Sequence, residues 1–246
     1  MIIPANWKLP DSIKTRLGQA SYGRQRAIIE EGHVLVVLHR PPDSEQSHRE
    51  GVLYWRSPAG EWQTSVGGPG MGVLKTHVQM YADLEAKLAK DYDHAMSAGE
   101  LFDLIETLTP LSRAARNMHQ ALQNAREAVK GDTAMIDVRD LAYEVDRNLD
   151  ILLQDVRNAI DYKIARESEE QARLSKEALH ASHRLNMLAA LFLPLTAITS
   201  LFGMNFHTGW ESNSPLMFWL ALGAGIGLGV LMMSWVLSGP GDRRER

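Results

Sequence analysis

A series of small and polar side chains runs through an otherwise apolar stretch between Leu185 and Phe206. Steps of four and three residues join Ser182, Asn186, Ala189, Leu193, Thr196, Ser200 and Gly203, and Leu193 is the one bulky apolar residue among them. Residues with this spacing share one face of a helix. Because hydroxyl and amide groups that face lipid lack hydrogen-bond partners, this face needs a neighbouring helix or a water-filled path beside it. Two interpretations stay open: close helix packing through small residues, and the lining of an aqueous pore.

Two long apolar segments at the C-terminal end of the chain would position this face. The first comprises residues 185–206 and the second residues 216–237, and neither contains a charged residue. Each has about the 20 residues that a helix needs to cross the hydrocarbon core of a bilayer. The intervening loop, residues 207–215, is short. We therefore predict a hairpin of two transmembrane helices.

The distribution of basic residues predicts the orientation of this hairpin. The flanks of the two segments contain Arg173, Lys176, Arg184, Arg243, Arg244 and Arg246, whereas the loop contains no lysine or arginine. Lysine and arginine are enriched on the cytoplasmic side of membrane helices. The first thirty residues carry several charges and no apolar core, unlike a secretory signal. We predict a multi-pass protein of the cell (inner) membrane with an external loop, a basic tail over residues 238–246 and both termini in the cytoplasm.

The first apolar segment ends in a distinctive tetrapeptide. Gly203-Met204-Asn205-Phe206 follows Leu193-Pro194-Leu195-Thr196 and six further residues. At the end of the first of two C-terminal spans, this arrangement resembles the GMN signature of the CorA-type divalent-cation transport family. The resemblance implies a homopentameric funnel in which five copies of this helix line one pore. It also implies that Gly203, Met204 and Asn205 form the pore mouth, where the Asn205 amide oxygens hold a hydrated Mg²⁺ ion through its water shell.

The loop contains two further candidate residues, His207 and Glu211. In a symmetric ring each would occur several times, so Glu211 could form an acidic collar that concentrates cations at the pore mouth. Members of the CorA-type family often carry a Met-Pro-Glu-Leu run here, whereas this chain has His207-Thr208-Gly209-Trp210-Glu211. Because of this departure, Zn²⁺, Co²⁺ and Ni²⁺ stay as alternatives to Mg²⁺ as the transported ion.

The second apolar segment is rich in glycine. It contains two pairs of glycines four residues apart, Gly223 with Gly227 and Gly225 with Gly229. Such pairs allow helices to approach closely. We predict that they pack against the first segment. Trp219 and Trp235 lie near the two ends of the second segment, as expected of anchors at a membrane interface.

Residues 1–72 predict a small β-rich (α+β) cytoplasmic unit. The apolar run His33–Arg40 indicates a strand, and a turn with proline and glycine between Gly51–Arg56 and Glu61–Ser65 indicates a hairpin. The stretch Gly67–Gly72 has the glycine spacing of a phosphate-binding loop. Val73, however, stands where such a loop needs a lysine. We interpret this stretch as a flexible linker.

Residues 73–131 predict cytoplasmic helices. One helix is expected over about Val73–Asp91, and a second from Ser97, with Glu100 completing a capping box. Thr109-Pro110 has the pattern of an N-cap and first helical residue and predicts a third helix. Gly131-Asp132 should end this helix and cap the next one.

A stalk helix is predicted over residues 132–184, continuing into the first apolar segment. No glycine or proline interrupts Thr133 to Leu193, and a helix from Thr133 to Phe202 would be ~105 Å long at ~1.5 Å per residue. An apolar seam should pack against the preceding helices or a neighbouring subunit, and it comprises Val138, Leu141, Val145, Leu149, Leu152, Val156 and Ile160.

The lower part of the stalk, from Ala165 to Arg184, is polar. It mixes acids and bases, which favours a solvated helix face over a face that conducts or senses cations. His180 and His183 have a spacing compatible with a metal pair, but no carboxylate or cysteine has a matching position. We therefore predict no metal site in this part of the stalk.

Composition narrows the function further. The 246 residues include no cysteine, and 26 Lys and Arg stand against 30 Asp and Glu. Disulfides and thiol chemistry are therefore excluded, and no catalytic constellation indicates an enzyme. We predict a mainly α membrane protein whose partners are its own copies, membrane lipid and divalent metal ions, with no nucleic acid.

The preferred function is a passive channel for hydrated Mg²⁺ driven by the membrane potential. This potential is worth ~4.6 kcal/mol for a divalent ion at ~100 mV. The alternative from a different class is a non-conducting, membrane-anchored helical scaffold. A scaffold has no need of a polar stripe that ends in Asn205.

Overall fold

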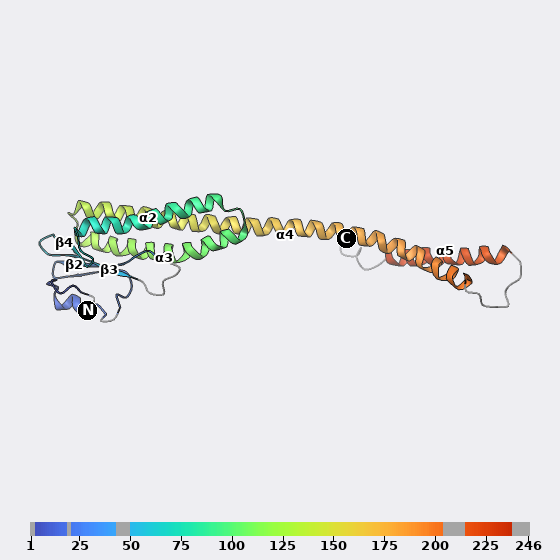
Figure 1. Ribbon diagram of the computed structural model, residues 1–246, viewed down its shortest axis with the longest axis horizontal. Helices are drawn as coiled ribbons and strands as arrows, with labels where there is room; N and C mark the ends of the chain where they lie inside the picture. The colour runs from blue at the N-terminus through green and yellow to red at the C-terminus, as the bar shows by residue number, and fades with distance from the viewer. Residues whose placement is uncertain (1–2, 19–20, 43–49, 204–214, 238–246) are drawn as a thin grey trace. The chain divides into compact units, whose positions relative to one another are not determined.

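The chain divides into two compact units, residues 1–165 and residues 166–246. The computed structural model describes residues 3–18, 21–42, 50–203 and 215–237. The first unit contains a short helix, a four-stranded sheet and long helices, and the helix α4 (Thr133–Gly203) continues into the second unit, which also holds α5 (Pro215–Leu237) (Figure 1). The predicted mainly α class with a β-rich N-terminal part is confirmed.

The sheet is an antiparallel meander in the order β1-β2-β3-β4. Its strands are β1 (Arg26–Glu30), β2 (His33–His39), β3 (Gly51–Arg56) and β4 (Trp62–Thr64). The strands predicted around His33, Gly51 and Glu61 are confirmed. The sequence pattern does not predict β1 or the short helix α1 (Asp11–Lys14). A two-residue turn joins β1 to β2, with positive φ at both Glu31 (52°) and Gly32 (77°), as such hairpins require.

Both faces of the sheet are buried. Alternate residues of β2 and β3, including Val36 and Tyr54, face the core shared with the helices. The residues between them, including Leu35 and Trp55, pack under the N-terminal segment, which supplies Trp7 and Ile13. Figure 1 shows the sheet along one side of the helices, with the blue N-terminal segment on its far side. This segment therefore completes the fold of the sheet.

The helix α2 (Gly70–His94) begins inside the stretch interpreted above as a linker. That interpretation is wrong for Gly70 to Gly72, which are helical. A Cβ atom on Gly70 would lie 2.4 Å from the backbone carbon of Trp62, so only glycine allows this close approach of helix and hairpin. Core residues on either side of the stretch belong to one hydrophobic cluster.

The helix α3 (Ala98–Ala128) starts at the predicted capping box. The Ser97 side chain accepts a hydrogen bond from Glu100 N, and the Glu100 carboxylate accepts one from Ser97 N. The helix start predicted at Thr109-Pro110 is wrong, because Pro110 lies inside α3. The Thr109 hydroxyl donates to the Ile105 carbonyl at 2.7 Å. Leu108 and Leu111 are both buried, so core packing outweighs the destabilising effect of the proline.

The helix α4 begins at Thr133, directly after its cap, and has 71 residues. Asp132 Oδ1 accepts a hydrogen bond from Met135 N at 3.2 Å, which confirms the predicted cap. Asp132 Oδ2 accepts a second bond from the Trp62 indole at 3.0 Å. Arg56 lies 3.6 Å from the same carboxylate. Asp132 therefore ties the β3–β4 hairpin to the start of the long helix.

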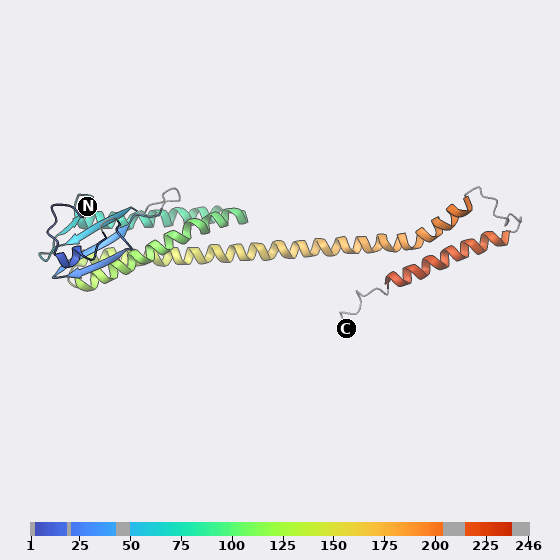
Figure 2. The same cartoon turned by 90° about the horizontal axis from the view of Figure 1, so that it is seen from below.

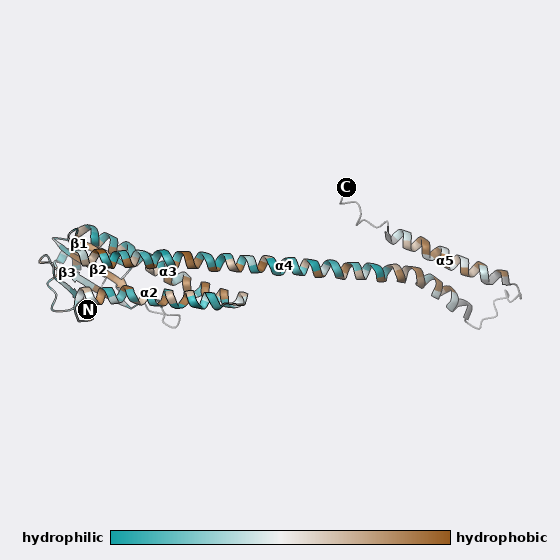
Figure 3. Ribbon diagram, turned by 90° about the horizontal axis from the view of Figure 1, so that it is seen from above, coloured by the Kyte–Doolittle hydropathy of each residue, from teal (hydrophilic) through white to brown (hydrophobic). Residues whose placement is uncertain are grey.

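The predicted apolar seam of α4 is confirmed as core. Val145, Leu149 and Val156 are almost completely buried against α2 and α3, and Leu141 is partly buried. In both Figure 1 and Figure 2, α2, α3 and the first part of α4 run side by side. The residues from 165 to 184 are all exposed, in keeping with the solvated face expected there. Figure 3 shows predominantly hydrophilic residues along this part of α4.

A buried polar network joins the sheet to α2. His77 Nε2 lies 2.8 Å from the His39 carbonyl oxygen, and Tyr54 Oη lies 3.1 Å from His77 Nδ1. Because a carbonyl can only accept, Nε2 carries the proton, and the Tyr54 hydroxyl donates to Nδ1. The Tyr81 hydroxyl also donates to the His39 carbonyl. Burial lowers the pKa of His77 to about 4, so this ring is neutral in the folded protein.

This network predicts that the first unit loses stability in mild acid. In the unfolded chain a histidine takes up its proton near pH 6.5, whereas folded His77 takes it up only near pH 4. The unfolded state therefore binds more protons between these pH values, and stability should fall by about 3 kcal/mol in total as the pH drops through this window.

Amide hydrogen exchange of β2 and α2 in the full-length protein measures this effect. Between pH 6.5 and 5 the exchange of these elements, corrected for its intrinsic pH dependence, should become faster. His77→Phe cannot take up a proton and should remove about one proton from the slope. An equal slope in both proteins would show that another group causes the acid sensitivity.

Candidate functional site

The polar stripe predicted on the first apolar segment lies open on α4. Ser182, Asn186, Thr196 and Ser200 are exposed, and Ala189 is half-buried. Leu193 is the one bulky apolar side chain on the stripe and is 66% exposed. In the part of the chain that the structure describes, no hydrogen bond joins these residues to another helix. From Ser182 to Ser200, a single chain therefore leaves most of the stripe without a cover.

The helix α5 packs against the opposite face of α4. Gly225 lies against the side chains of Leu195 and Ile198, and Gly229 lies against the backbone of Leu191. At 3.6 residues per turn, these three residues of α4 lie about half a turn away from the stripe. The second apolar helix thus covers the bulky side of the first one. The polar stripe therefore does not pack against α5 of the same chain.

Only one of the two glycine pairs makes this contact. A Cβ atom on Gly229 would lie 2.9 Å from the Leu191 carbonyl oxygen, whereas Gly223 and Gly227 have no atom within 4 Å of such a position. The predicted packing on the first segment is therefore confirmed for Gly225 and Gly229, and it is wrong for the other pair within this chain. The two pairs point in different directions from α5, and only one can face α4. Trp219 and Trp235 are 66% and 77% exposed.

The two glycine pairs allow a matched test of this packing. Gly229→Leu should weaken the α4–α5 contact by roughly 1–3 kcal/mol, because the new side chain meets a backbone oxygen that cannot move aside. Gly227→Leu adds the same side chain on the open side and should change little. The midpoint of unfolding of the full-length protein in mixed detergent micelles measures both. Equal shifts for the two variants would mean that α5 packs in another orientation.

A proline lies in α4 between two residues of the stripe, Leu193 and Thr196, and on the side of the helix that α5 covers. Pro194 is buried and has no N–H group for the Ala190 carbonyl, which favours a bend. Figure 2 shows α4 changing direction in its orange part. The Thr196 hydroxyl donates to the Phe192 carbonyl at 2.8 Å. Because its hydrogen is used within the helix, the Thr196 oxygen faces outward as an acceptor.

The predicted pore mouth lies outside the described residues. Met204, Asn205, His207 and Glu211 all fall in the range 204–214, which directly follows the end of α4 at Gly203. His180 and His183 are both exposed on α4. Across residues 3–18, 21–42, 50–203 and 215–237, no group of three or more His, Cys, Asp or Glu side chains has an arrangement that could hold a metal ion.

In the described ranges of the chain, no helix is both long enough and apolar enough to span a bilayer. This finding applies to α4 and α5 as far as their residues are described.

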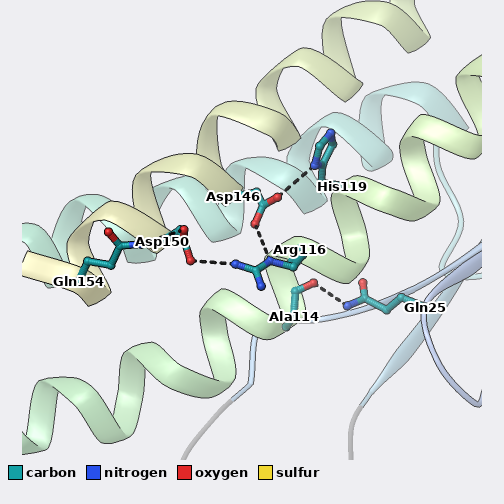
Figure 4. Close-up of polar contacts among 7 residues, drawn as sticks. All are labelled: Gln25, Ala114, Arg116, His119, Asp146, Asp150 and Gln154. Carbon is teal, nitrogen blue, oxygen red and sulfur yellow. Dashed lines mark hydrogen bonds and ion pairs between the residues drawn. The ribbon is translucent and has the colours of Figure 1, made fainter. Parts of the chain in front are cut away.

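A second cluster of charged residues, which the sequence analysis does not predict, joins α3 to α4. Figure 4 shows Arg116 and His119 of α3 directed toward Asp146 and Asp150 of α4. His119 Nδ1 lies 3.0 Å from Asp146 Oδ2, and an Arg116 nitrogen lies 2.8 Å from Asp150 Oδ1. The arginine occupies the space that a cation would need between the two carboxylates. These contacts fix the register of α3 against α4, and we assign them no chemical role.

A further side chain ties the sheet to the middle of α3. Gln25 Nε2 donates to the Ala114 carbonyl at 2.8 Å, as Figure 4 also shows. The Gln25 Oε1 atom accepts a hydrogen bond from His39 N at 3.2 Å. Both ends of this buried amide are therefore satisfied, as a buried polar group requires. This contact joins the sheet to α3, and the Arg116 cluster joins α3 to α4.

Comparisons with known proteins bear on the identity of the chain. The model of the family described as CorA-like Mg²⁺ transporter protein matches residues 78–244. The structure of the CorA magnesium transporter from Methanocaldococcus jannaschii is 14% identical, with 92% of this chain and 83% of that chain covered and a TM-score of 0.48. The structure of the full-length CmaX protein is 16% identical, with 91% and 79% covered and the same TM-score. No curated protein matches the chain significantly.

The family match covers more than half of the chain. It begins within α2 and includes α3, the whole polar stripe of α4, the Gly203-Met204-Asn205 tripeptide and α5. The predicted membership of the CorA-type family is thereby confirmed. The chain belongs to the CorA-like Mg²⁺ transporter family, which comprises transporters and not enzymes.

Proposed function

We propose that the protein is a homo-oligomeric channel that conducts hydrated Mg²⁺ passively across the cell membrane. The family resemblance implies that this oligomer is a pentamer. The observation that supports this proposal most strongly is the placement of α5. It covers the apolar side of α4 at Leu191, Leu195 and Ile198 and leaves the polar stripe exposed. In this proposal, other copies of α4 face the stripe and enclose a central path.

The stripe continues beyond Ser182 toward the first unit. The same steps of three and four residues lead to Leu179, Ser175, Ala172, Ser168 and Ala165. None of these is charged, although eight of the twenty residues from 165 to 184 are. A sustained 3.5-residue repeat is typical of like helices packed around a common axis. The uncharged face would therefore extend over ~50 Å of helix at ~1.5 Å per residue.

Neutral oxygen atoms suit the proposed ion. Mg²⁺ releases its water reluctantly and prefers six oxygen ligands in octahedral geometry. The side chains of Ser182, Asn186, Thr196 and Ser200 would accept hydrogen bonds from the bound water without the charge that would hold the ion too long. By the family resemblance, Gly203, Met204 and Asn205 would form the mouth of the path. Glu211 would form the outer acidic collar.

The topology of the proposal follows the sequence analysis. Residues 185–206 and 216–237 would span the membrane, with the loop 207–215 outside. Residues 1–72, 73–131 and 132–184 would form the cytoplasmic part, and the tail 238–246 would also be cytoplasmic. With an inside-negative potential, entry of a divalent cation is favoured by ~4.6 kcal/mol at ~100 mV.

Uptake into liposomes tests the function. Purified full-length protein in vesicles that contain a magnesium-sensitive dye should admit Mg²⁺ when an inside-negative potential is imposed, and collapse of the potential should stop net entry. Parallel runs with Zn²⁺, Co²⁺ and Ni²⁺ identify the preferred ion. If an inserted, oligomeric protein admits none of the four ions, the scaffold alternative replaces the channel.

A further inference from the structure

The charge of α4 reverses along its exposed part. Residues 161–170 contain four acidic residues against Lys163 and Arg166. Residues 171–184 contain only one acidic residue, Glu177, against five basic or imidazole side chains: Arg173, Lys176, His180, His183 and Arg184. All residues from 171 to 184 are exposed. The basic part directly precedes the first apolar segment.

Arg173, His180 and Arg184 lie on the side of α4 away from the polar stripe, and Lys176 and His183 lie between that side and the stripe. Residues seven apart occupy nearly the same position around a helix. Arg184 lies seven residues before Leu191, which contacts α5, and His180 lies fourteen residues before the buried Pro194. Lys176 and His183 lie next to them, at the border of the stripe. Arg173, His180 and Arg184 therefore continue, below the apolar segment, the face that α5 covers within it.

This basic face has no partner within the described residues. None of its five side chains makes a hydrogen bond or an ion pair with the described residues. Lys163, which precedes the basic face on α4, does have a partner, because it donates to the Met96 carbonyl. Arg116 of α3 is likewise paired, with Asp150 of α4. If the stripe faces the axis of an oligomer, the opposite side of α4 faces outward. The basic face would then meet whatever surrounds the base of the span.

We propose that the basic face, consisting of Arg173, Lys176, His180, His183 and Arg184, binds the anionic headgroups of phospholipids in the cytoplasmic leaflet. The inference rests on the proposed function in one respect, since residues 185–206 must cross the membrane. Guanidinium, ammonium and imidazole N–H groups all donate to phosphate oxygens. Cationic residues next to the cytoplasmic end of a span are attracted to anionic lipids.

The helix geometry predicts a graded contribution. At ~1.5 Å per residue, Lys176 lies ~14 Å and Arg173 ~18 Å along the helix from Leu185, whereas Arg184 is adjacent to it. The attraction of an anionic surface decays over a Debye length of ~8–10 Å at physiological salt. Arg184 should therefore contribute most and Arg173 least. Arg166, ~28 Å from Leu185, should contribute nothing.

Lipid retention by the full-length oligomer tests this proposal without any measurement of flux. The protein is equilibrated in detergent micelles that contain equal amounts of phosphatidylglycerol and phosphatidylcholine, and native mass spectrometry counts the lipids that stay bound. The wild type should retain phosphatidylglycerol preferentially. Arg184→Gln should lower this preference about fivefold, Lys176→Gln should lower it less, and Arg166→Gln, with the same change of charge, should leave it unchanged.

Three results would overturn the proposal. The first is an absence of preference for phosphatidylglycerol in the wild type, and the second is an equal effect of Arg184→Gln and Arg166→Gln. The third is dissociation of the Arg184→Gln oligomer in phosphatidylcholine alone, which would assign Arg184 to a contact between copies of the chain. Preferential retention in a protein that conducts no metal would support the lipid site and contradict only the channel. A protein that fails to float with vesicles would contradict both.

Discussion

Asn205→Ala should abolish divalent-cation uptake in the liposome assay while expression and oligomer size stay unchanged. In the proposed channel the Asn205 amide oxygens bind the water shell of the arriving ion, and alanine offers no acceptor. An ion that loses this contact must enter the narrow path with no acceptor for its water shell at the mouth. We expect uptake to fall to the level of empty vesicles. Size-exclusion chromatography of the variant verifies that the oligomer is intact.

Asn205→Asp provides the complementary change at the same position. The carboxylate keeps the acceptor atoms and adds charge, so it should hold cations more tightly and pass them more slowly. The expected result is saturation at a lower Mg²⁺ concentration with a reduced maximal rate. Uptake by Asn205→Ala at the wild-type rate would remove Asn205 from the mechanism and would favour the scaffold.

Leu193→Ser should make the channel leaky. Leu193 is 66% exposed and interrupts the polar stripe, so a ring of these side chains would exclude water from the path and stop ions there. A serine ring would stay hydrated. We expect the background conductance of the purified channel to rise roughly tenfold, which corresponds to about 1.4 kcal/mol of barrier.

Leu188→Ser is the matched control for this change. Leu188 is a leucine of similar exposure, 54%, but its position in the sequence is not among those of the stripe. The same substitution there should leave the background conductance unchanged. Unchanged conductance in Leu193→Ser would mean that Leu193 packs against a neighbouring helix and does not face the path. Planar-bilayer recordings at low Mg²⁺ concentration measure both variants.

Local sequence signals predict those parts of the fold that depend on residues close together in the sequence. The Ser97 and Glu100 capping box, the Asp132 cap and the uninterrupted α4 all depend on residues close in sequence. The seam at Val145 and Leu149 follows from helical periodicity alone. The strands β2 and β3 are β-branched and apolar enough to be recognised without knowledge of their partners.

The missed features depend on contacts between distant residues. The helical start of α2 at Gly70 requires the close approach of Trp62, and Pro110 is tolerated because Leu108 and Leu111 are buried against other elements. The pairing of Arg116 with Asp150 joins residues 34 apart. No local pattern predicts such contacts. Short elements such as β1 and α1 likewise depend on the packing of the sheet's outer face.

The candidate site was predictable as a periodicity but not as an orientation. The repeat from Ser182 to Gly203 is visible in the sequence, yet it fits helix packing and a pore lining equally well. Because α5 has two equivalent glycine pairs, the sequence does not show which face of α5 packs against α4. The contacts of Gly225 and Gly229 with α4 place α5 on the other side. That placement supports the interpretation of the stripe as a pore lining.

Cysteine accessibility along α4 tests most directly whether the stripe lines the path. The chain contains no cysteine, so single cysteines can be introduced one at a time from Leu179 to Ser200 without background. In vesicles that take up Mg²⁺, a charged, water-soluble thiol reagent should block uptake through cysteines at positions 179, 182, 186, 189, 193, 196 and 200. Cysteines at Leu191, Leu195 and Ile198 should stay unreactive under α5. Blockage confined to these three positions, or spread evenly around the helix, would contradict a path along the stripe.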